Sequence, residues 1–269
     1  MVYRSDTLPT AHNILKTMNT FVAAHSIVRK IWGKPDLVLF IFAGAAAEFS
    51  LNKSVDWLYF TGKLPKDPMG RMFSTVAYAH QIIFMNKDQA LAAIDMITKI
   101  HKDVENKRGM SIPDWAYRDV LFLLIWYSVA AFELLERKLT ETEKEEVFNV
   151  FYRLGLRMDL QELPEDYTAW ELSRKTHLQR NLERTHFSND LFLQYKKQLG
   201  PLRYHTMIAL QWLLAPPKVR QLLCLRENYF VRYLVDLYSL IRNPLLQRYV
   251  LPLLVPTAYR STVQKLYKR

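Results

Sequence analysis

Cysteine is nearly absent from this chain of 269 residues, which contains only Cys224. A single thiol forms no internal disulfide and no multi-thiolate zinc site, so we expect a protein of a reducing, cytoplasmic compartment. Glycine is also rare, with 7 residues, while 50% of the residues are hydrophobic. These values exclude collagen-like, low-complexity and disordered chains, and the length suffices for a substantial hydrophobic core.

Long hydrophobic runs and common catalytic motifs are missing as well. The apolar uncharged stretches at residues 37–47 and 120–132 are shorter than the ~18–20 apolar residues of a bilayer-spanning helix. No apolar segment follows Arg4 and Asp6 near the N-terminus, so we expect no signal peptide. No P-loop, Gly-x-Gly-x-x-Gly, Gly-x-Ser-x-Gly or His-Glu-x-x-His motif occurs, so nucleotide-dependent and serine-hydrolase chemistries lack their usual signatures.

Basic residues are in excess, with 37 Lys+Arg against 26 Asp+Glu and a net charge of +11. The chain lacks the dense Lys/Arg run that is typical of a nucleic-acid-binding tail, so we expect no nucleic-acid partner. In the last forty residues basic side chains alternate with aromatic and aliphatic ones. This pattern fits peripheral contact with an anionic membrane, and equally the solvated face of a packed C-terminal helix. The basic residues are Arg232, Arg242, Arg248, Arg260, Lys265, Lys268 and Arg269.

Helical periodicity extends through almost the whole chain, without the alternation and tight turns of β-hairpins. We therefore predict an all-α fold in a single domain over residues 1–269, with basic amphipathic helices over about 226–269. The expected helices cover about 11–32, 37–47, 68–85, 87–106, 113–138 and 140–155, capped at Asp67, Asn86 and Thr140, with later breaks at Ser188-Asn189-Asp190, Gly200-Pro201, Pro216-Pro217 and Asn243-Pro244.

Arg71 is the one charged residue within an otherwise apolar helix. A buried arginine needs a carboxylate, because its guanidinium does not lose its proton. The carboxylate could belong to a protein Asp or Glu, or to a ligand such as a haem propionate. Thr75, Tyr78 and Ile82 share the helix stripe of Arg71, whereas His80 lies on the opposite face.

His101 continues an apolar stripe formed by Ile94, Ile97 and Val104. A neutral imidazole that points into an apolar interior suits an axial ligand of haem iron, and a hydrogen-bonded core histidine is the alternative. His25 has a similar stripe position in its own predicted helix.

A second candidate metal site is the pair Glu183 and His186. The pair has the Glu-x-x-His spacing of di-iron carboxylate bundles, and His177 lies nine residues before His186. The second copy that such a site needs is missing, so a non-haem iron site is the weaker alternative.

Three ordered blocks resemble a known family. The first runs Asp67-Pro-Met-Gly-Arg71-Met-Phe-Ser-Thr75, then Ile82-Ile-Phe84, Ala90 and Ile100-His101. It is similar to the Asp-Pro-x-Gly-Arg-Leu-x-x-Thr … Val-x-Phe-Gly … Ala … Met-His signature of the haem-dependent oxygenases that include the latex-clearing protein (rubber oxygenase) and the ER-bound oxygenase of fungal mycophenolic acid biosynthesis. Two further similar blocks, at 119–143 and 152–164, extend the resemblance over about residues 30–225.

The resemblance implies a globin-like helical fold around haem b. By match to the motif, His101 is the proximal iron ligand, and Arg71 and Thr75 are cofactor-binding and catalytic residues beside the haem. The family reaction is cleavage of an isoprenoid double bond by O2. Ser74 stands where the latex-clearing branch has a lysine, so polyisoprene cleavage is not implied. Glu48, the nearest upstream candidate for the family's catalytic glutamate, fits the expected spacing poorly.

We therefore expect a haem b-dependent oxygenase or oxidoreductase that acts with O2 on a small hydrophobic, isoprenoid- or lipid-like substrate. Trp126 and Tyr127, from the apolar 120–132 segment, are candidates for the distal pocket. The alternative is a non-enzymatic all-α binding protein for an apolar ligand at a membrane surface.

Overall fold

The computed structural model describes residues 19–267, and within this range it confirms the all-α prediction. The described backbone forms helices and no β-strand, apart from two isolated bridges. The helices are α2 (Ile27–Trp32), α3 (Pro35–Leu51), α4 (Asp56–Phe60), α5 (Lys63–Lys66), α6 (Pro68–Phe84), α7 (Lys87–Arg108), α8 (Asp114–Leu135), α9 (Glu141–Arg157), α10 (Tyr167–Arg180), α11 (His186–Leu214), α12 (Pro217–Leu223), α13 (Tyr229–Ile241), α14 (Pro244–Leu254) and α15 (Thr257–Tyr267), with a short 3-10 turn at Lys53–Val55.

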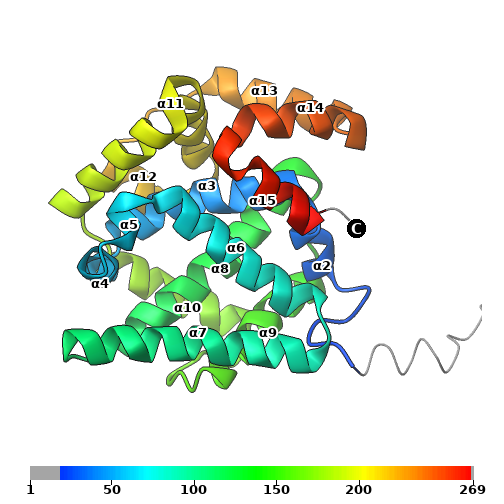
Figure 1. Cartoon of the computed structure of the whole chain (residues 1–269). Helices are drawn as coiled ribbons and strands as arrows, with labels where there is room; N and C mark the ends of the chain where they lie inside the picture. Colours follow the sequence, from blue (N-terminus) through cyan, green and yellow to red (C-terminus); the bar gives the residue numbers. More distant parts are fainter. Residues whose placement is uncertain (1–18, 268–269) are drawn as a thin grey trace, which may run out of the picture.

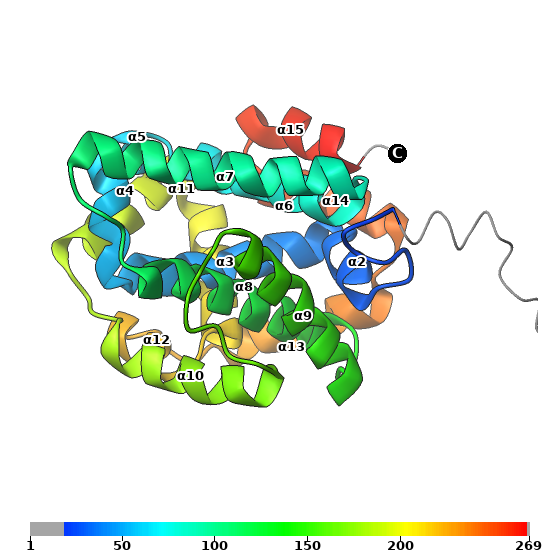
Figure 2. The same ribbon diagram turned by 90° about the horizontal axis from the view of Figure 1, so that it is seen from below.

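Helices α3 and α8 form the centre of the molecule, because both are apolar on nearly all sides. Figure 2 shows α6 and α7 on one side of this pair and α10 and α12 on the other. Helix α3 also packs against α11. At the crossing of α3 and α8, a Cβ atom on Gly44 would lie 2.4 Å from the ring of the fully buried Tyr127. The absence of a side chain at Gly44 therefore allows the two helices to approach.

The predicted caps form as expected. The Asp67 carboxylate accepts the Gly70 N–H at 2.8 Å, and the Asn86 side chain accepts the Gln89 N–H at 2.9 Å. Thr140 and Glu143 form a capping box, in which each side chain accepts the backbone N–H of the other residue. These caps begin α6, α7 and α9.

Several helix limits differ from the prediction. The helix expected at 37–47 spans Pro35–Leu51, and the break expected at Ser188-Asn189-Asp190 is wrong, because these residues lie in the first two turns of α11. The first described helix begins at Ile27, because the Ser26 hydroxyl accepts the Val28 N–H at 3.1 Å and caps it there. The predicted start near residue 11 lies outside the described residues, but residues 19–26 are not helical and His25 is exposed. At Gly200 the predicted break is a kink inside α11, since its φ of 72° interrupts the helix locally.

No helix among the described residues is both long enough and apolar enough to cross a membrane.

Candidate active site

A cavity lies between α3, α6, α7, α8 and α9. Its volume is about 280 Å³, close to the lower end of the range of about 300–1,000 Å³ for small-molecule sites. The walls are mostly apolar and include Phe42, Phe49, Ile100, Leu121 and Phe151.

Helix α6 supplies most of the polar groups of the cavity wall. Arg71, Ser74, Thr75 and Tyr78 all line the cavity, as the helical spacing of the predicted stripe requires. The Ser74 and Thr75 hydroxyls donate to the backbone carbonyl of Arg71 at 2.8 and 3.1 Å. A hydroxyl has a single proton, so in this arrangement each can only accept a further hydrogen bond.

Arg71 has no ion-pair partner among residues 19–267. Burial lowers the pKa of Arg71, and the electrostatic influence of Tyr78 opposes this shift only in part. A guanidinium nevertheless stays protonated at neutral pH. The described residues therefore leave a permanent positive charge facing the cavity, available to the carboxylate of a ligand.

His101 reaches the same cavity from α7. Burial lowers the pKa of His101 to about 4, and the charge of Arg71 contributes to the shift. The imidazole is consequently neutral at pH 7 and keeps one nitrogen lone pair available for a metal. Its Nδ1 atom is buried and finds no hydrogen-bond partner in the described part of the chain.

Tyr117, which also lines the cavity, packs beside His101 and is held by Glu105. The rings of Tyr117 and His101 lie 5.1 Å apart between centroids. The Tyr117 hydroxyl donates to Glu105 Oε1 at 3.2 Å, and the Ile112 N–H donates to the same oxygen at 2.8 Å. Sequence reasoning did not identify this support. Glu105 lies one helical turn after His101, which was a visible signal, but the contact with Tyr117 of α8 depends on tertiary structure.

Comparison with known families identifies the family of the chain. Residues 32–242 match the family described as "ER-bound oxygenase mpaB/B'/Rubber oxygenase, catalytic domain". The chain belongs to this oxygenase family. No curated protein and no solved structure matches the chain in the corresponding searches.

Family membership confirms the resemblance carried by the three sequence blocks, and the cavity of this oxygenase domain brings together the first block's Arg71, Thr75 and His101. His80, on the opposite face of α6, lies outside the cavity wall and contacts Phe84 and Tyr267, with ring centroids 4.4 and 5.6 Å away.

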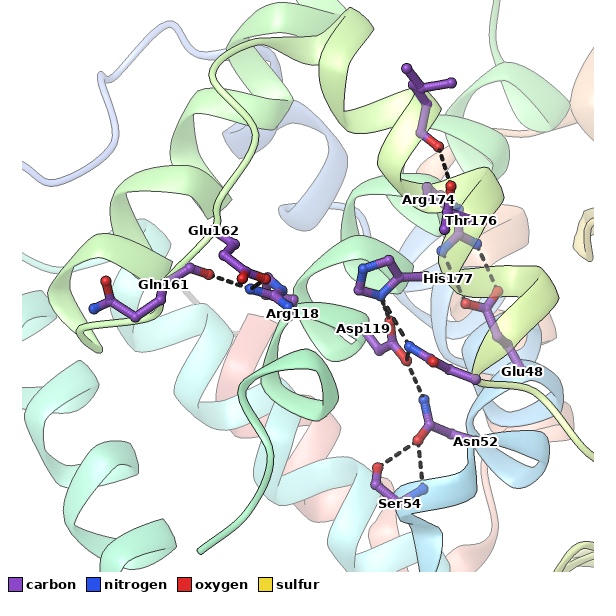
Figure 3. A network of polar contacts seen from close by, with 12 residues as sticks. Glu48, Asn52, Ser54, Arg118, Asp119, Gln161, Glu162, Arg174, Thr176 and His177 are labelled. Atoms are coloured by element: carbon purple, nitrogen blue, oxygen red, sulfur yellow. Dashed lines mark hydrogen bonds and ion pairs between the residues drawn. The ribbon is translucent and has the colours of Figure 1, made fainter.

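Other polar residues of the oxygenase domain form a separate buried network (Figure 3). Glu48 pairs with both terminal nitrogens of Arg174, at 3.0 and 2.7 Å. Asp119 accepts the Asn52 side chain at 2.9 Å and contacts His177. None of these side chains lines the cavity. Glu48 is therefore not placed as the family's catalytic glutamate in this structure, because its carboxylate is held by Arg174.

Several candidates from the sequence lie elsewhere. Trp126 donates to the Leu214 carbonyl at 3.1 Å and Tyr127 packs on Gly44, so the prediction that they line the pocket is wrong. His186 packs against the neighbouring Phe187 ring in a tilted arrangement. Within residues 19–267 no three His, Cys, Asp or Glu side chains cluster as a metal site, so no described cluster supports the alternative built on Glu183.

Proposed function

We propose that this oxygenase domain binds haem b and oxidises a small hydrophobic, isoprenoid- or lipid-like substrate with O2. The observation that carries the proposal is the convergence of a neutral imidazole, His101, and a guanidinium without an internal carboxylate partner, Arg71, on one apolar cavity.

The residues of the cavity fit such a cofactor. His101 would hold the iron, because a neutral imidazole is a common axial haem ligand. Arg71 would bind a haem carboxylate through charge-assisted hydrogen bonds. This carboxylate would be the anionic partner that the described protein residues do not provide. Thr75 would line the cofactor site beside Arg71, where its hydroxyl oxygen can accept but not donate a further hydrogen bond. When bound, haem supplies the redox chemistry of O2 activation.

The remaining wall residues have a binding role in this proposal. Side chains such as Phe42 and Leu121 exclude water and bind an apolar substrate through burial of its surface. Ser74 presents a neutral hydroxyl where the latex-clearing branch has a lysine, so α6 places no second positive charge in the cavity at that position. Arg71 keeps its charge at every relevant pH and orients a bound carboxylate without transferring a proton.

The test is the absorption spectrum of the purified protein after haem supplementation. We expect a Soret band that is lost or strongly shifted in His101→Ala and in His101→Gln, and retained in the control His80→Ala. Circular dichroism establishes that the variants are folded.

Two results would overturn the proposal. A colourless wild-type protein that co-purifies with apolar ligands would favour a non-enzymatic binding protein. Iron in metal analysis without porphyrin would favour a non-haem site.

A further inference from the structure

Helix α13 carries a broad apolar stripe that is exposed to solvent. Leu240 is 82% exposed and Phe230 is 69% exposed. At about 100° per residue, the exposed apolar side chains occupy one continuous sector of roughly 140° on the helix. This stripe, here called the α13 face, includes Tyr229, Phe230, Tyr233, Leu234, Leu237 and Leu240.

The opposite side of α13 is already packed against the protein. Val235 is buried, and Val231 and Tyr238 contact the main hydrophobic core. A narrow polar edge separates the two sides, where Arg232 bonds Asp236 at 3.1 Å. A helix that is apolar on two sides is normally covered on both, so the α13 face lacks a covering layer among the described residues.

The exposed face is firmly attached to the fold. The buried carboxylate of Asp36, in α3, accepts hydrogen bonds from Tyr238 at 2.8 Å, from Arg242 at 2.9 Å and from Gln247 at 3.0 Å. These contacts fix the end of α13 and the start of α14 to the central helix. The apolar stripe is therefore held outward by a buried polar cluster, as expected of a binding surface.

The net charge of the chain is concentrated in the same region. Residues 191–269 contain 13 Lys+Arg and 2 Asp+Glu, whereas residues 1–190 contain 24 of each. Beside the stripe, the exposed Arg226 and Arg232 are accompanied by the exposed Glu227 and Asp236. The excess of positive charge therefore belongs to the C-terminal segment as a whole. It opposes the approach of a second copy of this segment, because two positive segments would meet, and it favours an anionic partner.

We propose that the α13 face binds the surface of an anionic lipid bilayer, with α13 lying in the plane of the membrane. Leucine and phenylalanine side chains would enter the boundary between headgroups and acyl chains, and tyrosine hydroxyls would stay at the headgroup level. Basic residues would contact anionic headgroups. Figure 1 shows α13 and α14 along the edge of the molecule opposite α7, where no other helix covers them. This inference does not depend on the haem proposal.

Flotation of the full-length protein with vesicles tests the inference. We expect binding to phosphatidylcholine vesicles that contain phosphatidylserine, and weaker binding without phosphatidylserine or at high salt. Leu240→Glu should lower the partition coefficient at least about tenfold, since an apolar contact is replaced by a charge. The matched control is Leu172→Glu on α10. It makes the same charge change at a leucine that is 70% exposed, and should change binding less than about twofold.

Leu240 is exposed, so its substitution should preserve folding, and Phe230→Ser provides a second variant with no change of charge. Equal binding of wild type and Leu240→Glu, or no binding of wild type, would overturn the inference. So would a dimer in light scattering that Leu240→Glu dissociates, because the face would then be an interface between two copies. Binding that is insensitive to phosphatidylserine and salt would overturn the anionic part.

Discussion

Replacing Arg71 by methionine should stabilise the haem-free protein. The Arg71 charge is partly buried beside apolar side chains and has no carboxylate partner within residues 19–267. Methionine keeps a similar length and helix propensity. Full burial of an ion costs several kcal/mol, but Arg71 keeps some exposure, so we expect a gain of only about 1–2 kcal/mol. At about 2–4 °C per kcal/mol in a domain of this size, Tm should rise by about 2–8 °C.

The matched control is Arg174, a buried arginine that has an internal partner. Arg174 is paired with Glu48, and both side chains are almost completely buried. Arg174→Met leaves the Glu48 carboxylate buried without its partner, so we expect a loss of about 3–5 kcal/mol. Thermal and urea unfolding of the haem-free proteins measures both effects. Arg71→Met should also weaken haem binding, which would show that the unpaired charge serves a ligand at the expense of stability.

The reasoning is refuted if Arg71→Met destabilises the haem-free protein as Arg174→Met does, since Arg71 would then have a structural role. A second readout is independent of unfolding. The charge of Arg71 helps to lower the pKa of His101, so the pKa measured by NMR should rise in Arg71→Met.

Two further predictions concern the pH dependence of stability and the crossing of the central helices. The pKa of His101 is about 4 in the fold against 6.5 for an unperturbed histidine, so the unfolded state binds the proton first as the pH falls. The free energy of unfolding should therefore decrease by about 1–3 kcal/mol between about pH 6.5 and pH 4. Urea titrations of His101→Gln should show a shallower decrease, and parallel curves for the two proteins would contradict this. Gly44→Ala should lower the free energy of unfolding by about 1–3 kcal/mol through overlap with Tyr127, and the loss should shrink in a Tyr127→Leu background; an equal loss in both backgrounds would assign the effect elsewhere.

Local rules predicted the parts of the fold that depend on near neighbours. The caps at Asp67, Asn86 and Thr140 each connect residues three positions apart, so the sequence contains both partners. The N-terminal helix was predicted too long because the periodicity of Phe21 and His25 outweighed the cap at Ser26. The helical stripe indicated a helix start before Ser26 and the capping serine a start directly after it, and the structure follows the cap.

Pairings between distant segments could not be predicted in the same way. Glu48 and Arg174 are separated by 126 positions, and the contact between His101 and Tyr117 joins two helices. Nothing in the local pattern of Glu48 distinguishes a catalytic carboxylate from one held by an internal arginine. The same holds for Trp126 and Tyr127, whose apolar helix has several buried sides and only some of them face the cavity.

The approach of Arg71 to His101, by contrast, follows from elementary geometry. Helices α6 and α7 are joined by two residues, and such short connections place helices side by side and antiparallel. Arg71 lies 13 positions before the end of α6 and His101 lies 14 positions after the start of α7. At about 1.5 Å per residue, both are about 20 Å from the connection and hence at nearly the same height. The helical stripes turn both side chains inward, so this hairpin alone brings the cation and the imidazole together, while α3, α8 and α9 determine the size of the cavity around them.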